Sequence, residues 1–119
     1  MAKTLIDILL SIQREKEKYF KNYKFYSKRI KKEAKKILGK EIKVLVFGSI
    51  IKNEWGAGSD IDILIISDKL PEDIEKRGKI KTRIKSKISL FSPFQIHLAT
   101  EKEFKTWYKN FIKDDYIEI

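Results

Sequence analysis

Two aspartates separated by one residue open an otherwise aliphatic stretch, Asp60-Ile61-Asp62-Ile63-Leu64-Ile65-Ile66. Its composition predicts a strand, in which side chains two residues apart point to the same face. The two carboxylates would then lie side by side next to a hydrophobic core, where like charges repel and are poorly solvated. A divalent cation removes both penalties. The spacing therefore predicts a metal site formed by Asp60 and Asp62.

A glycine–serine pair, Gly48-Ser49, follows the preceding aliphatic run at 42–47. Glycine lets a phosphate approach the backbone closely, and the serine hydroxyl and the N–H groups after it can donate to phosphate oxygens. On its own the pair would indicate no more than a strand-ending turn. Together with the two aspartates on the next strand, it places phosphate donors beside hard oxygen ligands. Mg²⁺ uses this combination of few carboxylates and substrate phosphates, and metal-assisted nucleotidyl transfer requires it.

The motif Phe47-Gly48-Ser49, ten intervening residues and Asp60-Ile61-Asp62-Ile63 resembles the signature of the DNA polymerase β-like nucleotidyltransferase superfamily, and most closely that of its minimal members. The resemblance covers the chain from about Ile42 to the C-terminus. It implies an α/β (α+β) nucleotidyltransferase fold, with a small mixed β-sheet flanked by helices. In that family the Gly-Ser pair holds the triphosphate and the Asp pair binds two Mg²⁺ ions.

The same resemblance implies a reaction and a biological role. A nucleoside monophosphate, AMP from ATP in the simplest case, would be transferred to a hydroxyl group of a protein or an RNA. Many minimal members act as the antitoxin of a toxin–antitoxin pair, beside an all-helical partner of the HEPN type. We therefore expect Mg²⁺ as cofactor, a nucleoside triphosphate as substrate, and either a homodimer or a complex with a helical HEPN-type protein.

The third predicted strand, 94–99, departs from the family pattern. The family usually supplies a third carboxylate there, whereas this chain has Gln95, with His97 next on the same face. Glutamine can coordinate a metal through its carbonyl, but it is a poor base and carries no charge, so a second Mg²⁺ should bind weakly. His97 could replace the missing group as ligand or base, contact the nucleotide, or serve the fold alone. The candidate catalytic residues are Asp60, Asp62, Gln95 and His97.

Residues near the two motifs complete the candidate nucleotide-binding set, which comprises Gly48, Ser49, Lys52 and Ser59. Lys52 could contact the triphosphate, although lysines on a turn are more often simply solvated. Trp55, in the connection between the motifs, could stack on a base or pack the loop against the core.

Two other function classes remain open. The chain could be a catalytically weak or inactive homologue that acts as a nucleotide-binding or partner-binding antitoxin, a reading motivated by Gln95. It could also be a nucleic-acid-binding module, because its net charge is +10 and the basic excess is concentrated in 13–43 and 76–87. Such fields attract triphosphates, RNA or acidic proteins, but they also occur on solvated lysine-rich helices.

Length and composition bound the organisation. A chain of 119 residues suits one domain, 1–119, with an N-terminal helical extension at 1–38 and a catalytic core at 42–112. No apolar run approaches the ~20 residues that span a bilayer, and no secretory signal is evident, so we expect a cytoplasmic protein. The cysteine-free, Lys-, Glu- and Ile-rich composition resembles that of thermophile proteins.

The predicted order of elements is α-β-β-α-β-α. Apolar residues recur with a helical period from Leu5 to Ile37 and Gly39 is placed to end the helix, so a continuous helix of about 35 residues would measure about 52 Å. Because that length far exceeds the radius of a compact domain, the helix should either break between Asn22 and Ser27 or project and pack on another chain. Strands are predicted at 42–47, 60–67 and 94–99, and a helix across 77–88 with its first turn at Pro71. A last helix follows the capping box at Thr100, with an aromatic core-packing stripe formed by Phe104, Trp107, Tyr108, Phe111 and Ile112.

Overall fold

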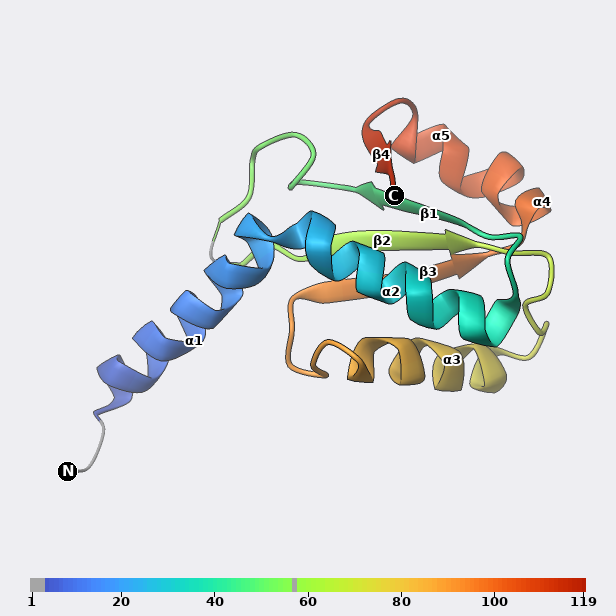
Figure 1. Ribbon diagram of the computed structural model, residues 1–119. Helices are drawn as coiled ribbons and strands as arrows, with labels where there is room; N and C mark the ends of the chain where they lie inside the picture. Colours follow the sequence, from blue (N-terminus) through green and yellow to red (C-terminus); the bar gives the residue numbers. More distant parts are fainter. Residues whose placement is uncertain (1–3, 57) are drawn as a thin grey trace.

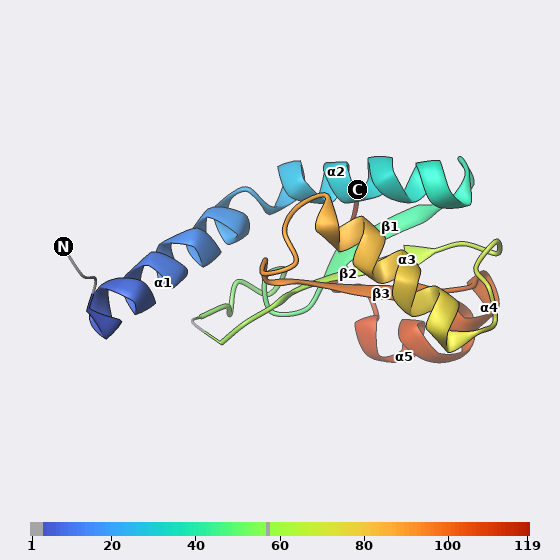
Figure 2. The ribbon, with the colours of Figure 1, turned by 90° about the horizontal axis from the view of Figure 1, so that it is seen from below.

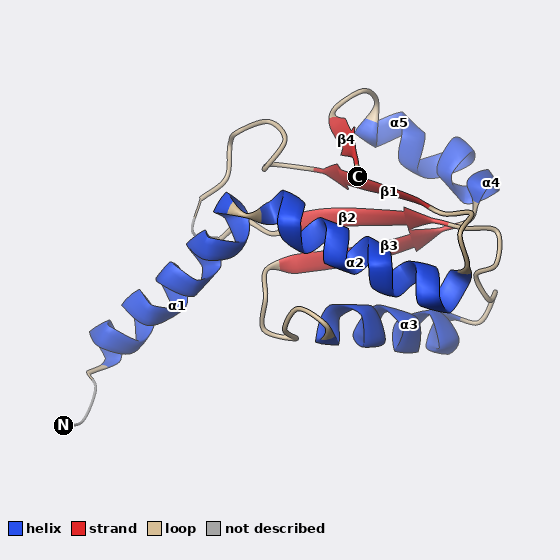
Figure 3. Ribbon diagram, in the orientation of Figure 1, coloured by secondary structure: helices blue, strands red, loops and turns tan. Residues whose placement is uncertain are grey.

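The computed structural model describes residues 4–56 and 58–119 and has a mixed α+β architecture (Figures 1 and 3). The elements are α1 (Leu5–Lys21), α2 (Tyr23–Leu38), β1 (Lys43–Phe47), β2 (Ile61–Ile66), α3 (Ile74–Ser86), β3 (Phe94–Ala99), α4 (Glu101–Glu103), the π-helical turn η1 (Phe104–Tyr108), α5 (Lys109–Ile112) and β4 (Tyr116–Glu118). The predicted strands and helices are all present. β4 was not predicted, because its three residues are too few to show a pattern.

The four strands form one mixed sheet in the order β3-β2-β1-β4. β1 runs antiparallel to β2 and β4, whereas β2 and β3 are parallel and are joined through α3. The small mixed sheet flanked by helices, which the resemblance implied, is therefore confirmed. The parallel pair matters for the site because it brings the beginnings of β2 and β3 to the same edge of the sheet.

Helices cover both faces of the sheet, so that the molecule has three layers (Figure 2). On one face, α2 and α3 bury alternate strand residues such as Val46, Ile63 and Ile96 in the larger core cluster. On the other face, the C-terminal helical segment packs Ile112 against Leu64 and other apolar residues in the smaller cluster. Because strand side chains alternate, Asp62 shares the second face with Leu64.

The N-terminal helical region breaks at Asn22, within the predicted interval. Asn22 leaves the helical conformation with φ −113° and ψ 28°, and α2 starts at the next residue. Beyond the break α1 projects from the sheet layers (Figure 1), and the longest dimension of the molecule is 52 Å. Its outer turns expose large apolar side chains, including Leu5, Leu9 and Ile12. None of the helices described here is both long and apolar enough to cross a membrane.

The helix across 77–88 is confirmed, but it begins later than predicted. Asp73 caps α3 by accepting a hydrogen bond from the Glu75 amide at 2.9 Å, and Pro71 precedes the helix. A carboxylate at this position satisfies a free N–H group and faces the positive end of the helix, so it fixes the first turn more strongly than the proline does.

The aromatic stripe of the C-terminal segment is correct only in part. The capping box at Thr100 and Glu103 is present and Ile112 is buried, but Trp107 is 70% exposed and Phe111 is 56% exposed. The reason lies in η1, where the backbone hydrogen bonds of a π-helix span five residues instead of four. The wider turn changes the angle between successive side chains, so the spacing of an α-helical stripe no longer keeps all five on one face.

Candidate active site

The sheet register brings the predicted site residues to one edge of the sheet. Gly48 follows β1, and Asp62 of β2 lies opposite Phe47 of β1 on one side and Gln95 of β3 on the other. His97 lies two residues further along β3, on the same face as Gln95. The shared side of Gln95 and His97 was predicted correctly from the alternation of β3, and the β2–β3 register places Asp62 on the same face of the sheet.

Asp62 connects the two sequence motifs. Its Oδ1 lies 3.2 Å from His97 Nε2, and both side chains are partly buried. Its Oδ2 lies so close to the backbone of Gly48 that a Cβ atom at position 48 would collide with the carboxylate. Gly48 also has φ +88°, a conformation that residues with a side chain rarely adopt. The glycine is therefore required by the approach of Asp62 as well as by the turn.

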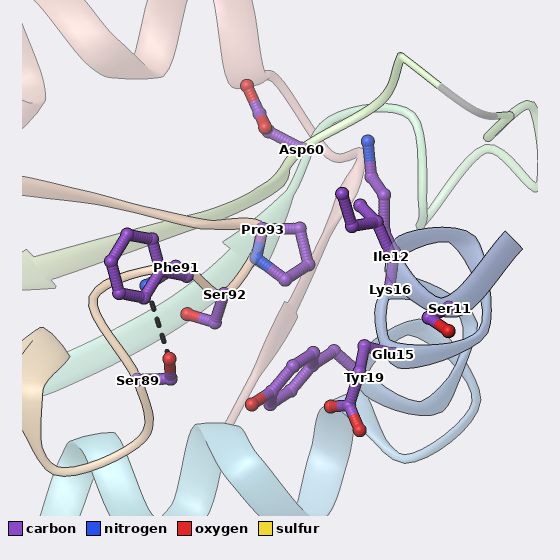
Figure 4. A pocket seen from close by; sticks show the side chains of 10 residues that line it. All are labelled: Ser11, Ile12, Glu15, Lys16, Tyr19, Asp60, Ser89, Phe91, Ser92 and Pro93. Carbon is purple, nitrogen blue, oxygen red and sulfur yellow. Dashed lines mark hydrogen bonds between the residues drawn. The ribbon is translucent and has the colours of Figure 1, made fainter. Parts of the chain in front are cut away.

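Asp60 lies just outside the strand, since β2 begins at Ile61 and not at Asp60 as predicted. The Ile61 amide donates to Pro93 O at 2.8 Å, which fixes the start of β2 against the segment before β3. Asp60 is exposed at the rim of a cavity of about 610 Å³ between α1 and residues 89–93. Figure 4 shows its side chain pointing away from the other side chains that line this cavity. The rule for strand neighbours alone does not fix its direction, because Asp60 is not part of the ladder.

The connection after Gly48 forms a short hydrogen-bonded turn, as predicted. The amides of Ile51 and Lys52 donate to Gly48 O at 3.1 and 3.4 Å, and the Glu54 amide donates to Ser49 O at 2.9 Å. Ser49 is thereby held directly after Gly48, at the strand end that faces Asp62. Lys52 is exposed on this turn.

The remaining loop residues of the predicted set have structural partners. The Ser59 hydroxyl accepts a hydrogen bond from the Gly56 amide at 2.9 Å, which closes the end of the loop. The Trp55 ring stacks on Phe20 with a centroid distance of 4.6 Å and an interplanar angle of 20°. Of the two roles considered for Trp55, the structure shows loop packing.

Four rings line the site beside Asp62. The centroid of the Phe47 ring lies 5.4 Å from that of His97 and 6.3 Å from that of Phe111. The centroid of the Tyr108 ring lies 6.2 Å from that of His97 and 5.5 Å from that of Phe111. The sequence contained the signal, an aromatic residue before the Gly-Ser pair and two more near the C-terminus. Helical spacing of aromatic residues usually indicates burial, so the sequence predicts a core stripe there.

The donor set suits a hard cation that takes few protein ligands. Among the residues described here, no group of three or more His, Asp and Glu side chains is arranged to hold a metal ion. The Asp62 carboxylate, with Gln95 opposite it in the sheet register, would leave the remaining positions to phosphate oxygens, water and the exposed Asp60 carboxylate, which matches the preferences of Mg²⁺. The residues present therefore fit one Mg²⁺ better than two.

The chain resembles known nucleotidyltransferases in sequence and structure. Residues 27–119 match the family described as "Nucleotidyltransferase domain". A crystal structure of a protein provisionally identified as a nucleotidyltransferase is 33% identical, with a TM-score of 0.61, over 77% of this chain and 95% of that one.

A second crystal structure, of a protein from Sulfolobus solfataricus provisionally identified as a nucleotidyltransferase, has a TM-score of 0.59 and 20% identity over 99% of this chain and 89% of that one. At that identity it supports the fold alone. No curated protein matches the chain significantly.

Proposed function

Because the chain belongs to the nucleotidyltransferase domain family, we propose that it binds a nucleoside triphosphate with Mg²⁺ and transfers its nucleoside monophosphate to a hydroxyl group. The observation that carries this proposal is the contact of the Asp62 carboxylate with Gly48 on one side and His97 on the other. It joins a phosphate-binding turn to a metal-binding carboxylate, as such a transfer requires.

Each residue of the site has a role in this proposal. Asp60 and Asp62 would hold Mg²⁺, which supplies charge neutralisation at the phosphates when bound. Ser49 and the amides of its turn would donate to the triphosphate, and Lys52 would add positive charge at the entrance. His97 holds Asp62 through Nε2, and this Asp62–His97 pair would take the proton from the attacking hydroxyl oxygen. The new bond forms between that oxygen and the α-phosphorus, and pyrophosphate leaves.

A calorimetric titration with Mg²⁺-ATP tests the binding step. We expect a clear binding heat for the wild type and its loss in Asp60→Asn/Asp62→Asn, because two neutral amides hold Mg²⁺ far less strongly than two carboxylates. Asp114→Asn, which removes a charge in the exposed turn after α5, is the matched control and should bind as the wild type does. Equal heats from the wild type and the double variant would contradict the proposal.

A catalytically weak homologue that acts as a binding antitoxin is the second candidate function. It is favoured by Gln95, which lies directly opposite Asp62 where the family usually has a third carboxylate. Transfer of label from radioactive ATP to protein or RNA should then be slow in the wild type and increase in Gln95→Asp. Rapid transfer by the wild type, with no gain in the variant, would rule out this alternative.

We also propose that the acceptor hydroxyl belongs to a protein or an RNA and that α1 carries the contact with a helical partner of the HEPN type or with a second copy. The exposed apolar side chains of α1 support a contact of this kind. Co-expression with the product of the neighbouring reading frame, followed by purification and label transfer, tests both points. A chain that stays monomeric, purifies alone and labels nothing would contradict them.

A further inference from the structure

We propose that Tyr108 and Phe111, together with Phe47, form a wall on which the base of the bound nucleotide stacks. This inference rests on the proposed function, since it requires a nucleotide at Asp60 and Asp62. It goes further because it assigns the base, and not only the phosphates, to a defined part of the chain. We refer to Phe47, Tyr108 and Phe111 as the aromatic wall.

The aromatic wall begins next to the metal-binding carboxylate. Phe47 lies opposite Asp62 in the sheet register, and the His97 ring is in contact with both Asp62 and Phe47. Tyr108 also contacts the same imidazole, and Phe111 closes the cluster by contacting Tyr108 and Phe47. Only the His97 ring separates the aromatic wall from Asp62, beside which the α-phosphate would bind. In a nucleotide, one ribose separates that phosphate from the base.

Phe111 is the part of the wall that the fold itself does not explain. It is 56% exposed, although Ile112 beside it is buried in the smaller core cluster. An exposed phenylalanine forgoes the stabilisation that burial of its ring would give. Here its ring lies beside Phe47 and Tyr108 with more than half of its surface open to solvent, and stacking on a base requires accessible ring surface.

The π-helical turn η1 is responsible for this placement. It lies between the capping box and α5 and rotates the residues after it relative to Phe104, so Ile112 faces the core and Phe111 lies beside that face. Turns of this kind are rare and are found often at functional sites. Burial, and to a smaller extent the charge of Glu103, raises the pKa of Tyr108.

Trp107 provides an internal comparison. It lies in the same turn and is 70% exposed, and it lines a cavity between α3 and the C-terminal segment that Tyr108 also borders but Phe111 and Phe47 do not. Exposure of aromatic residues is therefore not confined to the site. The contacts of Phe111 with Phe47 and Tyr108 distinguish the two, and they make Trp107→Ala a matched control for Phe111→Ala.

Comparing Mg²⁺-ATP with Mg²⁺-tripolyphosphate separates the base from the phosphates, because both ligands offer the same phosphate and metal contacts. Stacking of one base typically changes affinity by about 5- to 150-fold. We expect Phe111→Ala to weaken Mg²⁺-ATP at least 5-fold and to leave Mg²⁺-tripolyphosphate unchanged. Trp107→Ala should bind both ligands as the wild type does, and Phe111→Tyr should restore ATP binding.

Proton NMR of the bound nucleotide gives a second measurement, because a ring stacked on adenine shifts its H2 and H8 resonances upfield. These shifts should be present in the wild type and reduced in Phe111→Ala. The proposal is overturned if Phe111→Ala binds ATP normally, or if it weakens both ligands equally. A wild type that binds neither ligand would instead overturn the proposed function, and the aromatic wall with it.

Discussion

Replacing Gly48 by alanine tests how closely the two motifs of the site are coupled. The structure gives position 48 a φ of +88° and places the Asp62 carboxylate where the new methyl group would go. Alanine at position 48 should therefore have two separate effects. It should strain the turn after β1 and push Asp62 away from both Gly48 and His97.

The expected loss of stability follows from these two effects. A left-handed backbone costs a residue with a side chain about 1–2 kcal/mol. Loss of the hydrogen bond between Asp62 and His97 adds about 0.5–1.5 kcal/mol. A total near 2–3 kcal/mol should lower the melting temperature by about 8–12 °C, since about 1 kcal/mol corresponds to roughly 4 °C in a chain of this length.

Urea denaturation, thermal melting and Mg²⁺-ATP calorimetry measure the two effects in the same samples. Gly78→Ala is the control, because Gly78 lies inside α3 and a Cβ there meets no atom within 4 Å. It should stabilise the fold by about 0.5–1 kcal/mol and leave nucleotide binding unchanged. Gly48→Asn separates the causes, because asparagine tolerates a positive φ but still collides with Asp62.

We therefore expect Gly48→Asn to be more stable than Gly48→Ala but equally poor at binding Mg²⁺-ATP. The reasoning is refuted if Gly48→Ala melts with the wild type and binds Mg²⁺-ATP with the same affinity. In that case Asp62 would not lie against the strand end in solution, and the two motifs would not form one site.

Three further perturbations address single contacts. His97→Gln removes the imidazole that holds Asp62 and should weaken Mg²⁺-dependent nucleotide binding about 10-fold with little change in melting temperature; unchanged binding would show that His97 positions nothing. The pKa of Glu103 lies below its ordinary 4.5, because the Thr100 amide and, to a smaller extent, Arg77 donate to its carboxylate. The ionised carboxylate therefore stabilises the fold above pH 4.5, and this stabilisation is lost as the pH falls through the lower pKa of the folded state. The stability difference between wild type and Glu103→Gln, from urea titrations, should accordingly be constant above pH 4.5 and shrink below it, whereas a difference that does not vary with pH would contradict the assignment. Asp73→Ala removes the cap of α3 and should cost about 1 kcal/mol in urea denaturation without affecting Mg²⁺-ATP binding; an unchanged midpoint would show that the cap contributes nothing.

The strands, and with them the face of the site, could be predicted because their pattern is local. Alternation within β3 assigns Gln95 and His97 to one side of that strand, and alternation within β2 assigns Asp62 and Leu64 to one side of the other, without any knowledge of distant contacts. The break at Asn22 could be predicted for a different reason, since an unbroken helix of that length does not fit a domain of this size. Both predictions depend on geometry that the sequence alone determines.

The closeness of Gly48 and Asp62 could not be predicted, because it depends on the register between β1 and β2. A shift of one residue would turn Asp62 to the other face, and the alternation within β2 does not by itself exclude that shift, because both faces of the strand carry large apolar residues. The large apolar residues on both strands choose the register, since they must meet the same two cores. The glycine is thus read correctly from sequence as a turn residue, while its contact with the carboxylate is a result of packing.

The C-terminal segment shows how function and packing can share one pattern. The aromatic residues there have the spacing of a buried stripe, and Ile112 is indeed buried, but one π-helical turn moves Phe111 out of the core and into contact with Phe47 at the site. A wider turn is unfavourable on its own and carries no sequence signature of its own at this length. Its persistence here implies that the surrounding contacts determine it. In this molecule those contacts are Tyr108 with His97 on one side and Ile112 in the core on the other, so the geometry of the aromatic wall and the packing of the helix are fixed together.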